Sequence, residues 1–219
     1  MNPKNNCLIK RLAKADDPGK FLESAVTAGT QKDFAELHLC SQIKQKHNQT
    51  ILDHISKVLT CLGEKNEITV AAALFHDIGK VKTKRCINNR ITFYEHPLYS
   101  AMIAKKYLKK WKYGESFIDS VSRIIETHMF DIHTNLNKKN IRNFIAKVGM
   151  NNIKNWFVLR RADALSYNNI KESDILDGES YIQKYINGFE KTIYTNMTNM
   201  NKKESFNSKD FDIFGSNSG

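Results

Sequence analysis

The sequence lacks the features that would assign it to a membrane or secreted class of protein. It holds no long uncharged apolar run, so we expect no transmembrane helix. The opening residues, Met1 to Asn6, are polar and basic, and no apolar segment typical of a secretory signal follows Met1. The 4 cysteines are scattered without Cys-x-x-Cys spacing, which indicates reduced thiols rather than a disulfide framework. These absences together predict a cytoplasmic protein without membrane partners.

Acidic residues are also few relative to basic ones. The chain has 34 Lys and Arg against 23 Asp and Glu, a formal net charge of +11. Such an excess favours polyanionic partners through electrostatic attraction. A lysine-rich and asparagine-rich composition equally fits a proteome of AT-biased coding sequence, so the charge alone leaves both explanations open. With 219 residues, of which 41% are hydrophobic, the chain can build one domain with a real core and appendages.

Strand patterns are nearly absent from the sequence, and helical periodicity dominates. Apolar residues recur with a helical period in seven segments: 51–62, 68–75, 100–113, 117–128, 141–148, 153–165 and 180–194. The exception lies between Lys80 and Tyr94, where β-branched residues flank Asn88-Asn89 and predict a small β-hairpin. We expect the aromatic residues, Tyr94 included, to lie in the core.

The fold class that follows is all-α, a helical bundle with one small β-hairpin. We predict an N-terminal lead-in over residues 1–30, a helical domain over 31–194 and a flexible tail over 195–219. The tail is polar and low in hydrophobic residues, which is typical of a segment that cannot bury a core.

One motif stands out at the end of the apolar segment 68–75. The run leads directly into His76-Asp77, and Gly79 and Lys80 follow. Burying a carboxylate costs free energy unless something compensates for its lost hydration. A divalent metal can do so, because neutral imidazole and carboxylate are both ligands of such ions. The dipeptide itself is common, so a metal site requires further ligands elsewhere in the chain.

Four further candidate ligands stand on other predicted elements: His54, His96, His128 and Asp163. Each lies within or beside an otherwise apolar helical face. If the elements converge, six side chains can hold two metal ions with Asp77 as the bridge between them. The alternatives are ordinary: a histidine on an apolar stripe, such as His128, is more often a hydrogen-bonded core residue, and His96 can simply begin a helix.

The order of these residues resembles the HD-domain metal-dependent phosphohydrolase superfamily, in its variant with a dinuclear site. Three segments, Ile91–His96, Ile141–Ile145 and Leu159–Leu165, resemble the HD domain of bacterial tRNA nucleotidyltransferases, the CCA-adding enzymes. The likeness covers roughly residues 30 to 170. The nucleotidyltransferase head of that family, with its Gly-rich turn and paired aspartates, is missing, so CCA addition is not implied.

The resemblance implies a cofactor, a substrate and roles for individual residues. The cofactor would be one or two divalent ions (Mn, Ni, Co, Fe or Mg) on the six ligands, which would activate a water at Asp77. Lys80 would contact the substrate phosphate, although it can also be an ordinary exposed lysine, and His47 would donate to a phosphate or leaving group. From their position beside Asp163, we also expect Arg160 and Arg161 to steer anionic substrate, with one of the two facing solvent. His38 and His133 we expect at the surface.

The predicted function is hydrolysis of a phosphomonoester or phosphodiester by a metal-activated water. Nucleotides, 2′,3′-cyclic nucleotides and RNA ends are the substrates that the resemblance implies, with tRNA or other RNA as a candidate partner. Two alternatives stay open. One is an RNA-binding or tRNA-binding module without catalysis, and the other is a dinuclear-iron oxygenase. The oligomeric state and the native metal are not determined by the sequence.

Overall fold

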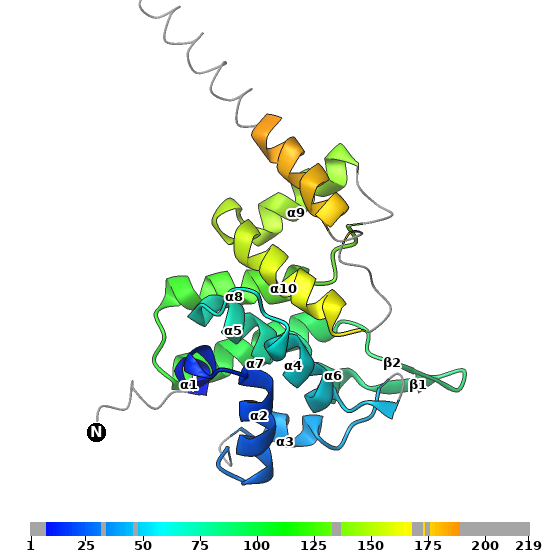
Figure 1. Cartoon of the computed structure of the whole chain (residues 1–219). Helices are drawn as coiled ribbons and strands as arrows, with labels where there is room; N and C mark the ends of the chain where they lie inside the picture. The colour runs from blue at the N-terminus through cyan, green and yellow to red at the C-terminus, as the bar shows by residue number, and fades with distance from the viewer. Residues whose placement is uncertain are drawn as a thin grey trace, which may run out of the picture. The chain divides into compact units, whose positions relative to one another are not determined.

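The structure is a computed structural model that describes residues 8–31, 34–45, 48–132, 137–167, 173 and 176–188 (Figure 1). Its helices are α1 (Leu8–Lys14), α2 (Pro18–Thr27), α3 (Ala35–Cys40), α4 (Ile51–Thr60), α5 (Glu67–Phe75), α6 (Lys80–Thr83), α7 (His96–Lys110), α8 (Glu115–Thr127), α9 (Lys138–Val148) and α10 (Ile153–Leu165). A short 3-10 turn, Met150–Asn152, precedes α10. The strands are β1 (Arg85–Ile87) and β2 (Arg90–Thr92). The predicted all-α fold with one small hairpin is confirmed.

The chain divides into two compact units, Met1–Leu176 and Asp177–Gly219. In the second unit residues 177–188 are helical. The predicted tail over 195–219 lies outside the described residues, and the predicted domain boundaries at 30 and 194 stay predictions. Within the described ranges, none of the helices is both long and apolar enough to cross a membrane.

Helix α5 is the central element of the first unit. Its residues from Thr69 to Phe75 are all buried, and α1, α4, α7, α8 and α10 pack around it. A helix that is apolar on every side has no face to offer water, so it occupies the interior. Asn66 caps its start by accepting from the backbone N–H groups of Ile68 and Thr69. Because α5 ends at Phe75, the chain delivers His76 and Asp77 into the middle of the unit.

Several boundaries differ from the prediction. The lead-in contains a helix that we did not predict, α1, because Leu8, Ile9 and Leu12 form an apolar stripe that packs inward. Helix α4 ends at Thr60 and is capped by Cys61, earlier than the predicted end. Helix α7 begins at His96, because Pro97 favours the first turn of a helix.

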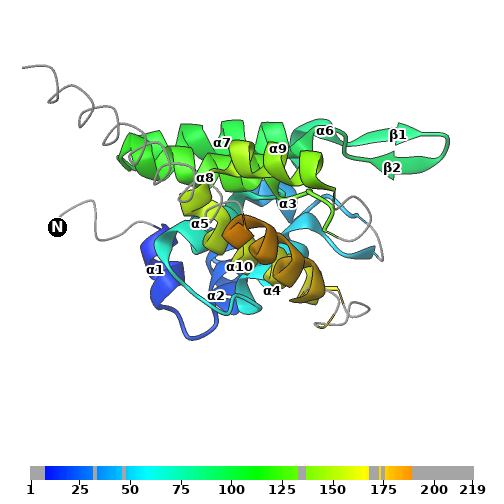
Figure 2. The same cartoon turned by 90° about the horizontal axis from the view of Figure 1, so that it is seen from above.

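The hairpin extends beyond α6, away from the packed helices (Figure 2). Strands β1 and β2 pair antiparallel, with Ile87 opposite Arg90. Asn88 and Asn89 both have positive φ, 49° and 56°, as a tight two-residue hairpin turn requires. The hairpin is shorter than expected, because the residues from Lys80 to Thr83 form α6. The prediction that Tyr94 lies in the core is wrong, since 69% of it is exposed.

Candidate metal centre

Six buried side chains meet at the inner end of α5. His54 comes from α4, His76 caps the end of α5, and Asp77 follows it. His96 is the first residue of α7, His128 caps the end of α8, and Asp163 lies in α10. All six are buried. Residues that are far apart in the sequence, from 54 to 163, therefore share one interior site.

Three of these side chains form what we call the first group: His54, His76 and Asp163. The Nε2 atom of His54 lies 3.2 Å from Nε2 of His76 and 3.2 Å from Oδ1 of Asp163. His76 Nε2 and Asp163 Oδ1 are 3.9 Å apart. Ligand atoms about 2.1 Å from a shared ion are themselves about 3.0–3.5 Å apart. The first group can therefore hold a metal ion.

The second group consists of Asp77, His96 and His128. The Nε2 atoms of the two histidines are 3.3 Å apart, and Oδ1 of Asp77 lies 3.2 Å from His96 Nε2 and 3.7 Å from His128 Nε2. This group can hold a metal ion as well. The other oxygen of Asp77, Oδ2, is 3.2 Å from Nε2 of His54. Asp77 thus contacts both groups, with one carboxylate oxygen toward each.

Backbone carbonyls fix the orientation of three of the imidazole rings. Nδ1 of His76 lies 2.8 Å from the carbonyl oxygen of Ala73, and Nδ1 of His128 lies 2.7 Å from that of Ile125. His96 has the same bond, 2.9 Å long, to the carbonyl three residues before it. A carbonyl can only accept, so Nδ1 carries the proton in each ring. In the neutral rings Nε2 is then left with a lone pair directed into the site.

His54 reaches the same state through a side chain. The hydroxyl of Ser166 donates to the backbone carbonyl of Asp163 at 2.6 Å, so its oxygen can accept from Nδ1 of His54 at 3.2 Å. When His54 is neutral, all four imidazoles therefore direct an acceptor nitrogen into the site, toward carboxylate oxygens that are acceptors too. Buried acceptors facing one another are unfavourable without a positive partner. The donor set fits divalent cations.

The pKa values of the carboxylates and histidines also indicate a site that favours a bound cation. Burial opposes ionisation of Asp77, yet His76 and Lys80 hold its pKa well below the usual value. The pKa of Asp163 is also lowered, against burial, mainly by its hydrogen bond to His54. Burial disfavours charge on His54, but hydrogen bonds to Asp163 and Asp77 outweigh it and raise the pKa of His54 to about 9. For His76 burial dominates and lowers the pKa to about 4. Both carboxylates are thus ionised at neutral pH.

Two basic side chains border the carboxylates. Lys80 donates to Oδ2 of Asp77 at 2.6 Å and to Oε1 of Gln45 at 2.9 Å. It is only 9% exposed, so the alternative of an ordinary exposed lysine is wrong. Arg160 donates to Oδ2 of Asp163 at 3.0 Å. Sequence reasoning missed the role of Gln45, which lies 35 residues before Lys80 and gives no spacing signal.

A close backbone approach brings the second group together. The N–H of Gly79 donates to the hydroxyl of Ser100 at 2.8 Å. A Cβ at Gly79 would lie 2.4 Å from the carbonyl oxygen of His96 and 2.4 Å from the backbone nitrogen of Ser100. Only glycine allows this contact between the start of α6 and the first turn of α7. The contact sets His96 beside Asp77.

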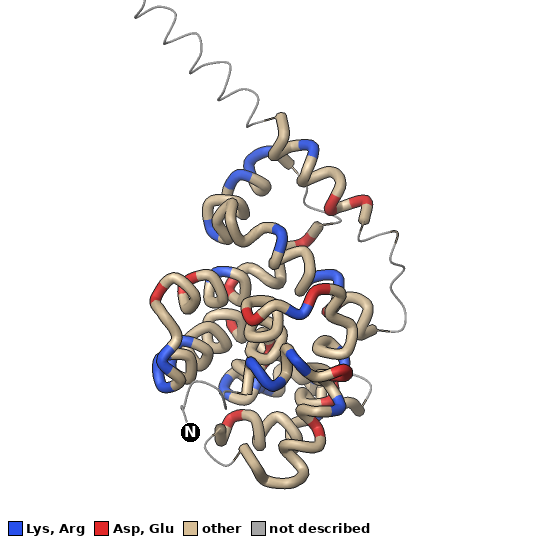
Figure 3. Tube along the Cα trace, turned by 60° about the vertical axis from the view of Figure 1, so that its left-hand side comes forward, with Lys and Arg blue, Asp and Glu red and all other residues tan. Residues whose placement is uncertain are grey.

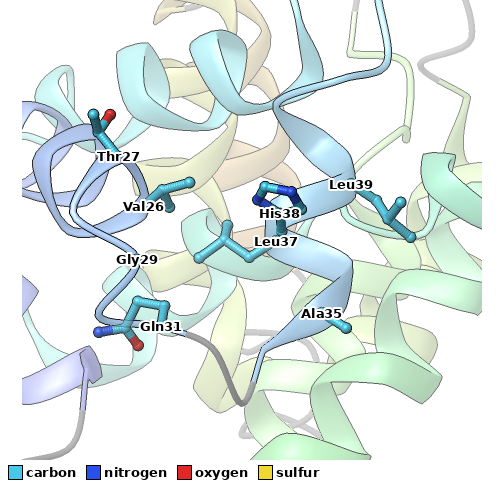
Figure 4. Close-up of a pocket in the computed structure, with 8 residues that line it drawn as sticks. All are labelled: Val26, Thr27, Gly29, Gln31, Ala35, Leu37, His38 and Leu39. Atoms are coloured by element: carbon cyan, nitrogen blue, oxygen red, sulfur yellow. The ribbon is translucent and has the colours of Figure 1, made fainter.

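The remaining predicted residues lie elsewhere. His47 and His133 fall outside the described residues. His38 is exposed, as predicted, and lies in a separate pocket between the end of α2 and α3 (Figure 4). None of the six candidate ligands lines that pocket, and apolar side chains such as Val26, Leu37 and Leu39 make up much of its wall. The pocket therefore does not belong to the candidate metal centre.

Comparison with known proteins agrees with the geometry. The HD domain family matches residues 37–168, a span that contains all six candidate ligands. Comparison with curated proteins gives no match. The matched span is more than half of the chain, and it carries two His/Asp groups able to hold a metal. The chain belongs to the HD domain family, whose superfamily is that of the metal-dependent phosphohydrolases.

Proposed function

We propose that this protein hydrolyses a phosphomonoester or phosphodiester at the site formed by the two groups. The observation that carries the proposal is the position of Asp77, whose two oxygens contact different groups while Lys80 holds it from the side. In this proposal His54, His76, His96, His128, Asp77 and Asp163 are the metal ligands. Divalent ions bound there supply a water of lowered pKa and neutralise phosphoryl charge.

The basic residues at the edge of the site support an anionic substrate. An ammonium group has three N–H donors, and Lys80 uses two of them on Asp77 and Gln45. The third is available to a phosphate oxygen. Nε2 of Gln45 is buried and has no partner among the described residues, so it is a second donor at the same place. Buried donors without partners are costly unless a ligand satisfies them.

The same donors argue against the oxygenase alternative. A site bordered by Lys80, Arg160 and the Gln45 amide, whose N–H has no partner among the described residues, is suited to an oxyanion with several acceptors. We further propose, from the resemblance to the HD domain of tRNA nucleotidyltransferases, that the substrate is a nucleotide, a 2′,3′-cyclic nucleotide or an RNA end. The role of His47 as a proton donor stays a prediction.

The test is a phosphoester panel on the full chain loaded with Mn²⁺ or Ni²⁺. It should include bis(p-nitrophenyl) phosphate, 2′,3′-cyclic AMP and an RNA ending in a 3′-phosphate. We expect turnover in the wild type and its loss in His76→Ala, with the helical circular dichroism signal retained. A wild type that binds two equivalents of metal yet hydrolyses none of these would contradict the proposal. Oxygen uptake by the iron-loaded protein would favour the oxygenase.

A further inference from the structure

The segment between Lys80 and His96, which contains the hairpin, is basic. Residues 81–94, which we call the basic arm, contain four cationic residues and no Asp or Glu. The cations are Lys82, Lys84, Arg85 and Arg90, and each is exposed. Lys and Arg also gather without acidic residues at 96–114 and 132–162 (Figure 3). In the first of these stretches, Lys105, Lys106 and Lys109 pair with glutamates of other helices. The basic arm is therefore a local concentration of unneutralised charge.

The four cations of the basic arm form no ion pairs with the described part of the protein. Among the described residues, no ion pair involves any of the four, whereas lysines on the helices, such as Lys106 and Lys154, pair with acidic side chains. Exposed cations without acidic neighbours project an attractive potential for a polyanion. A hairpin of two strands also leaves the outer edge of each strand unpaired, so backbone donors are available there.

The pairing register of the hairpin shows which side chains of the arm lie on the same face. Arg85 pairs with Thr92 and Arg90 pairs with Ile87, so the two arginines lie on the same face, two residue positions apart along the hairpin. This spacing amounts to about 7 Å along the strands. The two arginines can therefore contact neighbouring phosphates of one strand. Their guanidinium groups suit phosphate because they donate in a fixed, forked geometry.

Exposed apolar side chains stand among these cations. Ile87 is 45% exposed, Ile91 is 49% exposed and Tyr94 is 69% exposed. A combination of a cationic track with an aromatic platform is what single-stranded nucleic acid requires, since its bases stack on aromatic rings. Tyr94 lies at the base of the arm, where the chain returns to the helices.

The base of the arm is joined to the candidate metal centre. On one side the chain leaves Lys80, which contacts Asp77, and on the other side it passes through Phe93. The carbonyl of Phe93 accepts from Nδ1 of His96, and its ring lies 5.5 Å from Nζ of Lys80. A single-stranded nucleic acid that lies along the arm would thus have a phosphate near Lys80. A membrane or a protein partner would gain nothing from this connection.

We propose that the basic arm binds a single strand of RNA and presents its phosphoester to the candidate metal centre. The inference deepens the proposed function and rests on it for the fate of the bound phosphoester. Binding by the arm is separate from hydrolysis. The two can therefore fail independently.

The test compares two double variants of the full chain. Arg85→Ala/Arg90→Ala removes two charges from the arm, and Lys14→Ala/Lys57→Ala removes two exposed charges from α1 and α4. Binding of a fluorescein-labelled single-stranded RNA of 20 nucleotides is measured by anisotropy at several salt concentrations. We expect the arm variant to bind roughly tenfold more weakly, with a salt dependence smaller by about two in slope, and the control to change little. Tyr94→Ala should weaken binding roughly fivefold.

Hydrolysis of bis(p-nitrophenyl) phosphate should be unchanged in the arm variant, because this small diester does not reach the arm. Equal weakening of RNA binding in both double variants would overturn the inference. It would also be overturned if the arm variant lost binding to anionic phospholipid vesicles but kept its affinity for RNA. RNA binding that depends on the arm, in a chain that hydrolyses no phosphoester, would support the inference while contradicting the proposed function.

Discussion

The first and second groups of the candidate metal centre share Asp77 but differ in what supports them. The first group has a carboxylate of its own, Asp163, and two dedicated partners, Ser166 on His54 and Arg160 on Asp163. The second group depends on Asp77 for its only carboxylate. Because affinity for a divalent cation rises with the number of anionic ligands, we infer that the first group binds its ion more tightly.

Asp77→Asn is expected to have the largest effect, since it removes the charge that both groups share. We expect turnover to fall about 10³-fold, because two cations lose the anion between them. Metal content measured by inductively coupled plasma mass spectrometry should fall at the same time. A variant that keeps two ions and wild-type turnover would show that Asp77 is only a structural residue.

His54→Ala and His128→Ala test the asymmetry directly. Removing His54 should weaken the tighter ion at least 100-fold, while removing His128 should eliminate the weaker ion and leave the tighter one unchanged. Isothermal titration with Mn²⁺ into metal-free protein distinguishes the two cases. If His128→Ala abolished binding of the tighter Mn²⁺ ion instead, the second group would be the one with the higher metal affinity.

The proton on His54 gives a prediction for the first group in the metal-free protein. A pKa raised from 6.5 to about 9 by Asp163 and Asp77 means that the folded state binds this proton more tightly than the unfolded state. The resulting stabilisation is fully present below pH 6.5 and is lost as the pH rises to 9, by roughly 3 kcal/mol. Urea unfolding at several pH values, with and without Mn²⁺, measures it.

Metal binding has the opposite dependence on pH, because the ion must displace that proton. Affinity at the first group should therefore increase as the pH rises toward 9. A metal-free protein whose unfolding free energy stays constant between pH 6.5 and 9 would contradict the assignment of the proton to His54.

Ser166→Ala should have the smallest effect and should be confined to the first group. Without the hydroxyl, the His54 ring loses the partner that orients it, and metal affinity should fall 10- to 100-fold. Ser122→Ala is the matched control, because the Ser122 hydroxyl is equally buried but makes no hydrogen bond within the described residues. Equal losses in both variants would indicate a packing effect instead.

The sequence indicated which residues meet in the two groups better than it indicated the residues that support them; their role as metal ligands stays a prediction. His54, His128 and Asp163 could be singled out because a polar residue on an apolar face needs a buried partner. Ser166 could not, since it lies 112 residues from His54 and serine is ordinary near the end of a helix. The hairpin was predictable because Asn-Asn suits its turn, but the exposure of Tyr94 depends on whether another element covers that face.

The bonds from Nδ1 to carbonyls three residues earlier have a consequence for how this site can vary. Where His76 and His128 end their helices, the main chain itself orients the rings, through the carbonyls of Ala73 and Ile125 in the last turn of each helix. Side chains around the rings can then be exchanged without re-aiming them, provided the helices still stop at the same residues. The residue at which each helix ends thus determines the orientation of the ring. A one-residue insertion in α5 or α8 would therefore disturb the candidate metal centre more than many substitutions nearby.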